Sequence, residues 1–230
     1  MVRGLLFVVV VGCAGVAAAP APAPPVAVVE VPLGTPLAVP GETMVYAITL
    51  RGLAVARVQV AVGQPGWFER HPAIIVKSHG ETDGLVALIG ELDWTLETTI
   101  DLERGTPLLT VEDAIITFRG KKEANHERNE SSTHTIHSAV IALRGWRASP
   151  GQHGTIGMQI ADAHIELDVH EAGREFLDKP AVRYEGIARG KYPFKIWLSD
   201  DTARVPLRMQ TATKWGEVAI ELVEYTAPRD

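Results

Sequence analysis

Polar and apolar residues alternate along most of the chain from residue 41 onward. A period of two places successive side chains on opposite faces of a β-strand. Gly52 interrupts the alternation between residues 45–50 and 55–62, which is typical of a β-hairpin. The same pattern predicts further strands at residues 73–78, 86–88, 91–97, 98–103, 114–119, 162–170, 181–188, 193–198, 205–213 and 217–225.

The segment 162–170 shows the strictest alternation. Its polar positions are Asp162, His164, Glu166, Asp168 and His170, and its apolar positions are Ala163, Ile165, Leu167 and Val169. This pattern is typical of an antiparallel sheet with one face in water. We therefore expect the last three apolar residues to face the core and the polar ones to be solvated.

Two segments depart from this period. Residues 120–132 are charged and polar, which predicts an exposed loop. Residues 133–146 place apolar side chains at spacings of four and three, which predicts a short helix. The candidate capping residues are Ser131, Ser132 and Thr133. The chain is thus predicted to be mainly β, with one short helix.

The first residues indicate export. Residues 1–12 combine the cation Arg3 with a short apolar stretch, as in a signal peptide. Cys13 follows a small residue at the end of this stretch, and the arrangement resembles a bacterial lipobox, in which such a cysteine is acylated. The alternative is an ordinary cut near residues 15–17, which would discard Cys13 with the leader.

Residues 13–40 are rich in alanine and proline and predict an extended, semi-rigid tether. The remaining residues, 41–226, are expected to form a single β-rich domain. Together, these segments predict a domain that a lipid on Cys13 attaches to a membrane. Because Ala14 rather than aspartate follows the cysteine, resemblance to enterobacterial lipoprotein sorting places the protein at the outer membrane, facing the periplasm.

Charge and cysteine content exclude several classes of function. The net charge of −6 makes nucleic acid an unsuitable partner. Cys13 is the only cysteine, so the chain can form neither an internal disulfide nor a cysteine-based metal site. The sequence contains no phosphate-binding loop, dinucleotide-binding fingerprint or nucleophile elbow, and it predicts no cofactor.

Histidines provide the main candidates for a polar site. On a helix, His134 and His137 would share a face, as two metal ligands can. A third ligand would have to come from His153, His164 or Glu166, and solvation of these residues is the simpler interpretation, so no metal is predicted. The alternating histidines and carboxylates of 162–170 have the residue types needed for acid–base catalysis, but any solvent-facing strand shows the same pattern.

Two other sets of residues allow simpler interpretations. Asp200 and Asp201 are adjacent, so on a strand they would point to opposite faces, and a turn in which aspartate bonds to its own backbone is favoured. The five tryptophans can line an apolar or glycan pocket, although large aromatic residues more often lie in a core. They are Trp67, Trp94, Trp146, Trp197 and Trp215.

Several segments resemble a family of exported bacterial proteins, domain of unknown function 3108. Residues 41–57, GETMVYAITLRGLAVAR, are similar to its opening strand pair, and residues 137–144, HSAVIALR, to its central short helix. IWLSDDTARVPLR at 196–208 and KWGEVAIEL at 214–222 resemble its closing hairpins. The resemblance implies an antiparallel β-barrel-like or strongly curved sheet in the cell envelope, and it implies no activity.

Three hypotheses for function follow. The first is a lipid-anchored envelope protein that binds an apolar or amphiphilic component, because a barrel-like sheet of this size can enclose one small ligand. The second is an enzyme acting on an envelope glycan, with His134, His137, His164 and Glu166 among its chemical groups. The third is a structural envelope protein with no small ligand. The absence of catalytic motifs favours binding over catalysis.

Overall fold

The computed structural model describes residues 29–30, 37–84, 87, 90–149, 152–160, 163–188 and 191–228. The predicted signal peptide, Cys13 and most of the predicted tether lie outside these residues, as do residues 86 and 88 of one predicted strand. Within residues 13–40, the described parts are 29–30, a two-residue strand, and 37–40.

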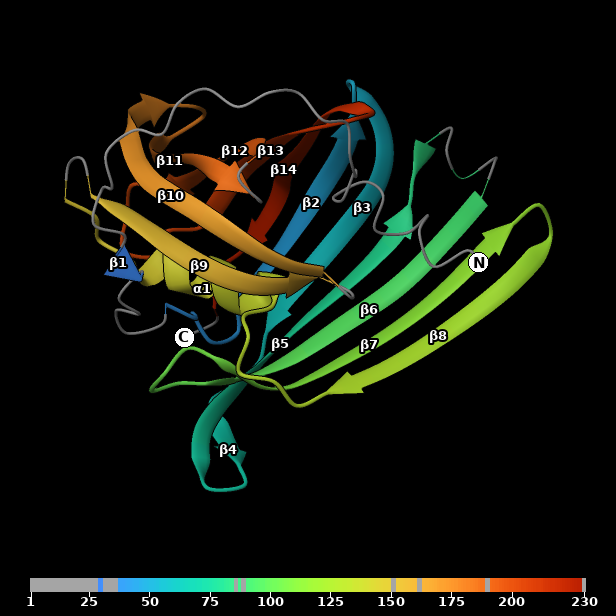
Figure 1. Cartoon of the computed structure of the whole chain (residues 1–230), viewed down its shortest axis with the longest axis horizontal. Coiled ribbons are helices and arrows are strands. Elements are labelled where there is room, and N and C mark those ends of the chain that lie inside the picture. The colour runs from blue at the N-terminus through green and yellow to red at the C-terminus, as the bar shows by residue number, and fades with distance from the viewer. Residues whose placement is uncertain are drawn as a thin grey trace.

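The described residues form fourteen strands and one helix (Figure 1). The strands are β1 (Val29–Glu30), β2 (Thr43–Leu50), β3 (Leu53–Val62), β4 (Gly66–Phe68), β5 (His71–Thr82), β6 (Gly90–Asp101), β7 (Pro107–Phe118), β8 (Lys121–Asn129), β9 (His153–Ile160), β10 (Ala163–Phe176), β11 (Pro180–Ala188), β12 (Tyr192–Ser199), β13 (Pro206–Thr213) and β14 (Gly216–Thr226). The helix is α1 (Ile136–Gly145).

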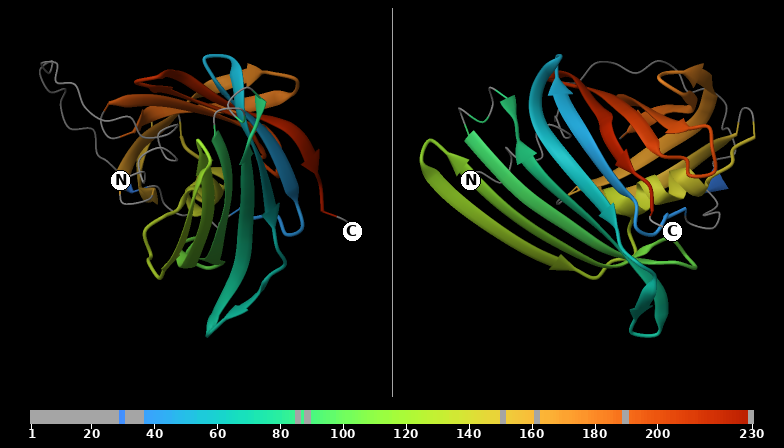
Figure 2. Two further views of the ribbon diagram at one scale, coloured as in Figure 1. Left: turned by 90° about the vertical axis from the view of Figure 1, so that its right-hand side faces the viewer. Right: turned by 180° about the vertical axis from the view of Figure 1, so that it is seen from behind.

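One curved sheet contains all of these strands. The hydrogen-bonded order is β1-β9-β10-β11-β12-β13-β14-β2-β3-β5-β6-β7-β8, and β4 pairs only with β5. Neighbouring strands are antiparallel except β1 and β9. Within the described residues β8 and β1 do not pair, so the sheet wraps around α1 without closing (Figures 1 and 2). The predicted barrel-like or strongly curved antiparallel sheet with one short helix is confirmed.

Most of the predicted strands are present, but three predictions were wrong. Ala87, the described residue of the predicted strand 86–88, lies between β5 and β6 and belongs to neither strand. Residues 91–97 and 98–103 belong largely to a single strand, β6, because neither glycine nor proline interrupts the chain between them. Residues 121–129 form β8 instead of a loop, in continuous register with β7 from Phe118–Lys121 to Thr110–Asn129. Every residue of β8 is exposed, so its polar sequence reflects an edge strand with both faces in water.

The helix begins slightly later than predicted. Its N-cap is Thr135, not one of the residues 131–133. The Thr135 side chain accepts a hydrogen bond from the Ser138 backbone N–H, while the Ser138 hydroxyl accepts one from the Thr135 N–H, which completes a capping box. His134 therefore precedes the helix.

The core lies between α1 and the sheet and has two parts. One packs the helix against β9–β12 and contains Ala139, Leu143, Trp146, Ile156, Met158, Ile165, Val169, Val182, Tyr184, Ile196 and Leu198. The other lies at β2, β3, β5 and β6 and contains Met44, Tyr46, Val62, Ile74, Val76, Ile100, Ile141 and Val205. Because α1 contributes to both, it joins the two halves of the sheet.

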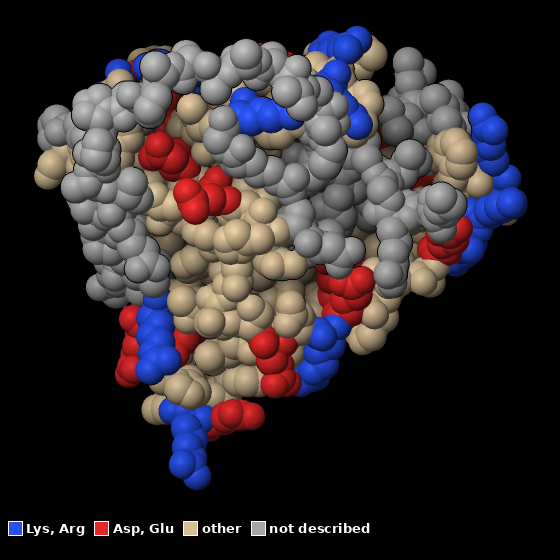
Figure 3. Space-filling model, viewed as in Figure 1, with Lys and Arg blue, Asp and Glu red and all other residues tan. Residues whose placement is uncertain are grey.

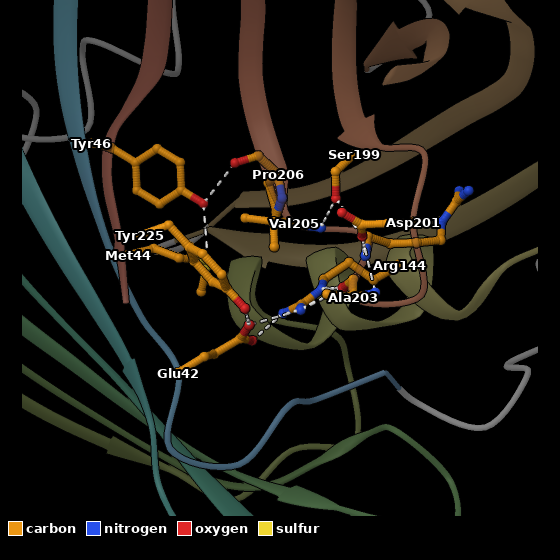
Figure 4. Close-up of polar contacts among 11 residues, drawn as sticks. Glu42, Met44, Tyr46, Arg144, Ser199, Asp201, Ala203, Val205, Pro206 and Tyr225 are labelled. Atoms are coloured by element: carbon orange, nitrogen blue, oxygen red, sulfur yellow. Dashed lines mark hydrogen bonds and ion pairs between the residues drawn. The ribbon is translucent and has the colours of Figure 1, made fainter. Parts of the chain in front are cut away.

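A buried ion pair holds the C-terminal end of α1 in place (Figure 4). Arg144 is bonded through both terminal nitrogens to the carboxylate of Glu42, and both side chains are almost completely buried. Arg144 also donates to the carbonyl of Ala203, at 2.8 Å from its Nη2. The hydroxyl of Tyr225 lies 3.4 Å from Glu42 Oε2. The chain entering β2 is thereby joined to the helix and to β14.

Candidate functional site

His137 is a buried link between the helix and the sheet. Its Nδ1 lies 3.0 Å from Thr98 Oγ1 on β6, and its Nε2 lies 3.0 Å from Ser78 Oγ on β5. A neutral imidazole can donate at one nitrogen and accept at the other, so both hydroxyls can be satisfied. Burial lowers the pKa of His137 from 6.5 to about 4, and the ring is neutral at pH 7.

His134 does not share a helical face with His137. It lies before the N-cap Thr135, where its backbone forms an isolated bridge with Met158 of β9. Its Nδ1 lies 3.0 Å from the hydroxyl of Ser138. The helix starts after His134, because the capping box is formed by Thr135 and Ser138. The two histidines therefore do not form the paired site that a shared helical face would have given.

His164 and Glu166 lie elsewhere, on the outer face of β10. Both are exposed, whereas Ile165 and Val169 are buried and Leu167 is half-buried. Farther along this face, His153 and His170 stack with ring centroids 4.7 Å apart, and His153 Nδ1 lies 3.3 Å from Asp168 Oδ1. The structure therefore separates His164 and Glu166 from the buried His137.

No metal cluster is formed by these groups. Across the residues that the structure describes, no three His, Cys, Asp or Glu side chains are arranged so that they can hold a metal ion.

The predicted turn at Asp200–Asp201 is confirmed. Asp201 Oδ1 accepts hydrogen bonds from the hydroxyl of Ser199 and from the backbone N–H groups of Ala203 and Arg204. Burial by itself would raise the pKa of Asp201, but these bonds and the charge of Lys179 lower it overall. The carboxylate is occupied in holding the turn.

A partly uncovered apolar surface follows the inner face of the sheet. We define this face by Ser78 and Thr98, which contact the helix through His137. Side chains two residues apart, and those directly opposite on neighbouring strands, share a face. The half-buried apolar residues that we group as the open inner face therefore lie on the same side of β3, β6 and β7: Val60, Leu92, Trp94, Leu96, Ile116 and Phe118.

Trp94 lies against β5 near the middle of the open inner face. It pairs with Gly80, and a Cβ atom at Gly80 would come within 2.6 Å of the indole ring. The ring therefore packs directly on the β5 backbone, which only glycine permits. Trp94 was one of five tryptophans considered from the sequence, which gave no sign of its position above Gly80.

An acidic residue adjoins this apolar surface. Glu112 of β7 lies on the same face, opposite Leu96 of β6 and Glu127 of β8. Burial, followed by the nearby charge of Glu127, raises the pKa of Glu112. The inner side of the sheet is thus apolar at β6 and becomes charged toward the edge strand β8.

The outer face carries a different depression, with a volume of about 490 Å³. It is lined by Thr43, Val45, Arg57, Gln59, His79, Glu81, Glu224 and Thr226. These side chains are mostly exposed and polar, and His79 Nδ1 lies 3.7 Å from Asp93. This depression lies on the opposite side of the sheet from Trp94.

Together, the open curved sheet, the enclosed helix and the open inner face define a β-barrel-like protein. The chain belongs to the family of proteins of unknown function named DUF3108, whose sequence profile matches residues 45–223. This confirms the family inferred from the sequence. No curated protein matches the chain.

The solved structures that the chain matches have little sequence in common with it. A β-barrel-like protein of the family of unknown function DUF1849 from Brucella abortus has a TM-score of 0.55 at 11% identity, over 84% of this chain and 100% of that chain. The hypothetical protein CT021 from Chlamydia trachomatis has a TM-score of 0.40 at 10% identity, over 83% of this chain and 89% of that one. A protein from Bacteroides fragilis is provisionally described as exported, with a YmcC-like fold. It has a TM-score of 0.34 at 11% identity, over 84% of this chain and 99% of that chain. The fold comparison therefore rests on the Brucella protein.

The described residues include no α-helix with the length and hydrophobicity of a transmembrane span.

Proposed function

We propose that this protein is a lipid-anchored component of the cell envelope that binds an apolar or amphiphilic envelope molecule on its open inner face. The observation that supports this most directly is the incomplete covering of that face. The helix fills one part of the curved sheet, while six apolar side chains on β3, β6 and β7 remain half-buried. A hydrocarbon chain placed there would remove further apolar surface from water.

The charge distribution is consistent with this proposal. On the face shown in Figure 3 uncharged residues form most of the described surface, and basic side chains gather at the tip of the β7–β8 hairpin, which carries Arg119, Lys121 and Lys122. An amphiphile can place its apolar part on the open inner face and its polar group at the β8 edge, where every residue is exposed.

The proposed location in the cell envelope is based on the predicted leader and on Cys13. They lie outside the described residues, so the anchor is supported by the sequence pattern alone. The proposal places the domain at the outer membrane, facing the periplasm.

Catalysis on a glycan has less support. That hypothesis requires the histidines and carboxylates to converge, yet His137 is enclosed by Ser78 and Thr98 while His164 and Glu166 are exposed on another strand. A structural protein without a ligand is the alternative that a binding experiment can distinguish.

Two adjacent isoleucines on β7 provide a matched test. Ile116 belongs to the open inner face, while Ile115 points to the outer face and is 39% exposed. Ile116→Glu should weaken binding of a fluorescent phosphatidylethanolamine by about tenfold or more, since it removes an apolar contact and adds a charge. Ile115→Glu should stay within about twofold of the wild type, as surface substitutions usually do.

The ligand itself is sought by native mass spectrometry of the protein purified from its own envelope. We expect a co-purifying lipid that Ile116→Glu loses and Ile115→Glu keeps. Equal binding by the two variants, or no bound amphiphile in the wild type, would contradict the proposal.

A further inference from the structure

The β4–β5 hairpin extends beyond the rest of the sheet. Its register runs from Gly66–Ala73 to Phe68–His71, while the ladder between β5 and β6 begins only at Ala73. On its other side β5 pairs with β3 no farther than Val76. Among the described residues the tip therefore pairs with no further strand, and it projects from the body of the molecule in all three views (Figures 1 and 2).

A tryptophan occupies this projecting tip. Trp67 is 77% exposed, the highest value among the large hydrophobic residues recorded as exposed in the described chain. It pairs with Pro72 across a two-residue turn, Glu69–Arg70, in which Glu69 adopts a positive φ of 53°. An indole has a large apolar ring and one N–H donor, so it is suited to the boundary between lipid and water.

The chain enters β2 beside the base of this hairpin. The Gly41 N–H donates to the carbonyl of Val62, and the Val62 N–H donates to the carbonyl of Glu42. A Cβ atom built on Gly41 would lie 3.2 Å from Gln64, two residues before β4. The residues that lead directly into β2 therefore lie at the end of the domain from which Trp67 projects.

The charges at the tip favour insertion of the ring over electrostatic attraction. The turn carries one acid and one base, Glu69 and Arg70, so they contribute no net charge. The whole chain is acidic, with a net charge of −6, and would gain little from an anionic surface. Binding through this hairpin thus depends on apolar contact.

We propose that the β4–β5 hairpin inserts into the headgroup region of a phospholipid bilayer, with Trp67 as its anchor. The insertion orients the domain with the Gly41 end toward the membrane. This role is separate from ligand binding on the open inner face, and its test uses other residues.

The test places a fluorophore at either end of the domain. The full chain carrying Cys13→Ser has no other thiol, so Arg70→Cys labels the hairpin turn and leaves Trp67 in place. Leu53→Cys labels the opposite end of β3, about 30 Å away for ten residues of strand. Leu53 is 64% exposed, so both sites are accessible. Any contribution of the leader to vesicle binding is the same in both proteins.

Each protein is mixed with vesicles of phosphatidylethanolamine and phosphatidylglycerol that contain lipids brominated on their acyl chains. We expect quenching of the fluorophore at residue 70 and none at residue 53. Trp67→Asp in the residue-70 protein should reduce the inserted fraction about tenfold. The matched control is Ile75→Asp, at a residue of β5 that is 45% exposed and lies outside the tip, and it should leave the quenching unchanged.

Three results would overturn the proposal. They are stronger or equal quenching at residue 53, no quenching at either residue, and quenching at residue 70 that survives Trp67→Asp. Circular dichroism of the variants separates these results from misfolding. None of these results depends on the open inner face, so they do not test the ligand-binding proposal, which has its own experiment.

Discussion

Burial determines what the histidines of this protein can do. His137 has the residue type and spacing of a metal ligand or a catalytic base, yet both of its nitrogens are occupied by hydroxyls on β5 and β6. His164 is exposed on the outer face of β10. The same side chain thus links the helix to the sheet at one position and is solvated at the other.

The buried His137 should make the fold sensitive to acid. Its pKa is lowered from 6.5 to about 4 in the folded state, so below pH 6.5 the unfolded chain takes up a proton that the folded chain does not. Stability therefore falls as pH decreases, by about 3 kcal/mol between pH 7 and pH 4. Urea unfolding at a series of pH values measures this slope.

His137→Gln serves as the control, because glutamine can hydrogen-bond to Ser78 and Thr98 but does not titrate in this range. The variant will be less stable overall, but the change in its stability between pH 7 and pH 4 should be smaller. An unchanged pH dependence would show that other groups cause the acid sensitivity.

Two strands show where sequence patterns succeed and where they fail. The alternation of β10 predicted its faces correctly, because one side packs on the core and the other meets water. The edge strand β8 has no buried face, so its sequence is polar throughout and resembles a loop. Hydrophobic periodicity detects a strand only when one of its faces is covered.

The register of β10 can be tested with a pair of adjacent residues. Ile165 is only 4% exposed and packs in the core, whereas the neighbouring Glu166 is exposed. Ile165→Ala should cost about 2–5 kcal/mol of unfolding free energy. Glu166→Ala should change it by no more than about 0.5 kcal/mol. Leu167 is half-buried, so truncating it should have an intermediate effect.

Urea or thermal unfolding of these variants provides the measurement. Equal destabilisation by Ile165→Ala and Glu166→Ala would mean that both faces of β10 are covered. A large loss from Glu166→Ala alone would indicate a specific role for its carboxylate.

At the scale of the whole molecule, the one helix among the described residues covers only part of the inner face of the open sheet. The helix joins β9–β12 to β2, β3, β5 and β6 through the two parts of the core. One end of β6 and the paired end of β7 extend beyond the helix, and these ends carry Trp94 and Ile116 on their inner face. The proposed binding surface is thus a consequence of the unequal sizes of the sheet and the helix.

The proposed anchor predicts how the whole protein distributes in the cell. Wild-type protein should incorporate a fatty acid analogue, and Cys13→Ser should abolish the label, because no other cysteine can accept it. An ordinary cut near residues 15–17 then releases the domain into the soluble fraction. Ala14→Asp keeps the cysteine and should remain labelled. Unlabelled wild-type protein would exclude the lipoprotein assignment.

The sequence by itself determined most of the strands that have one buried face, the short helix and the family. These depend on local periodicity, on glycine turns and on motifs such as WLSDD, all of which lie within short stretches of chain. It also predicted the turn at Asp201, because the bonds that hold this turn span at most three residues.

Only the tertiary structure decided the position of His137 and the extent of the open inner face. Ser78 and Thr98 lie 59 and 39 residues before His137, and sheet curvature brings them to the helix. Likewise, Trp94 lies against Gly80 because β5 and β6 pair in one particular register. Both features depend on contacts between distant segments, which a pattern of period two cannot specify.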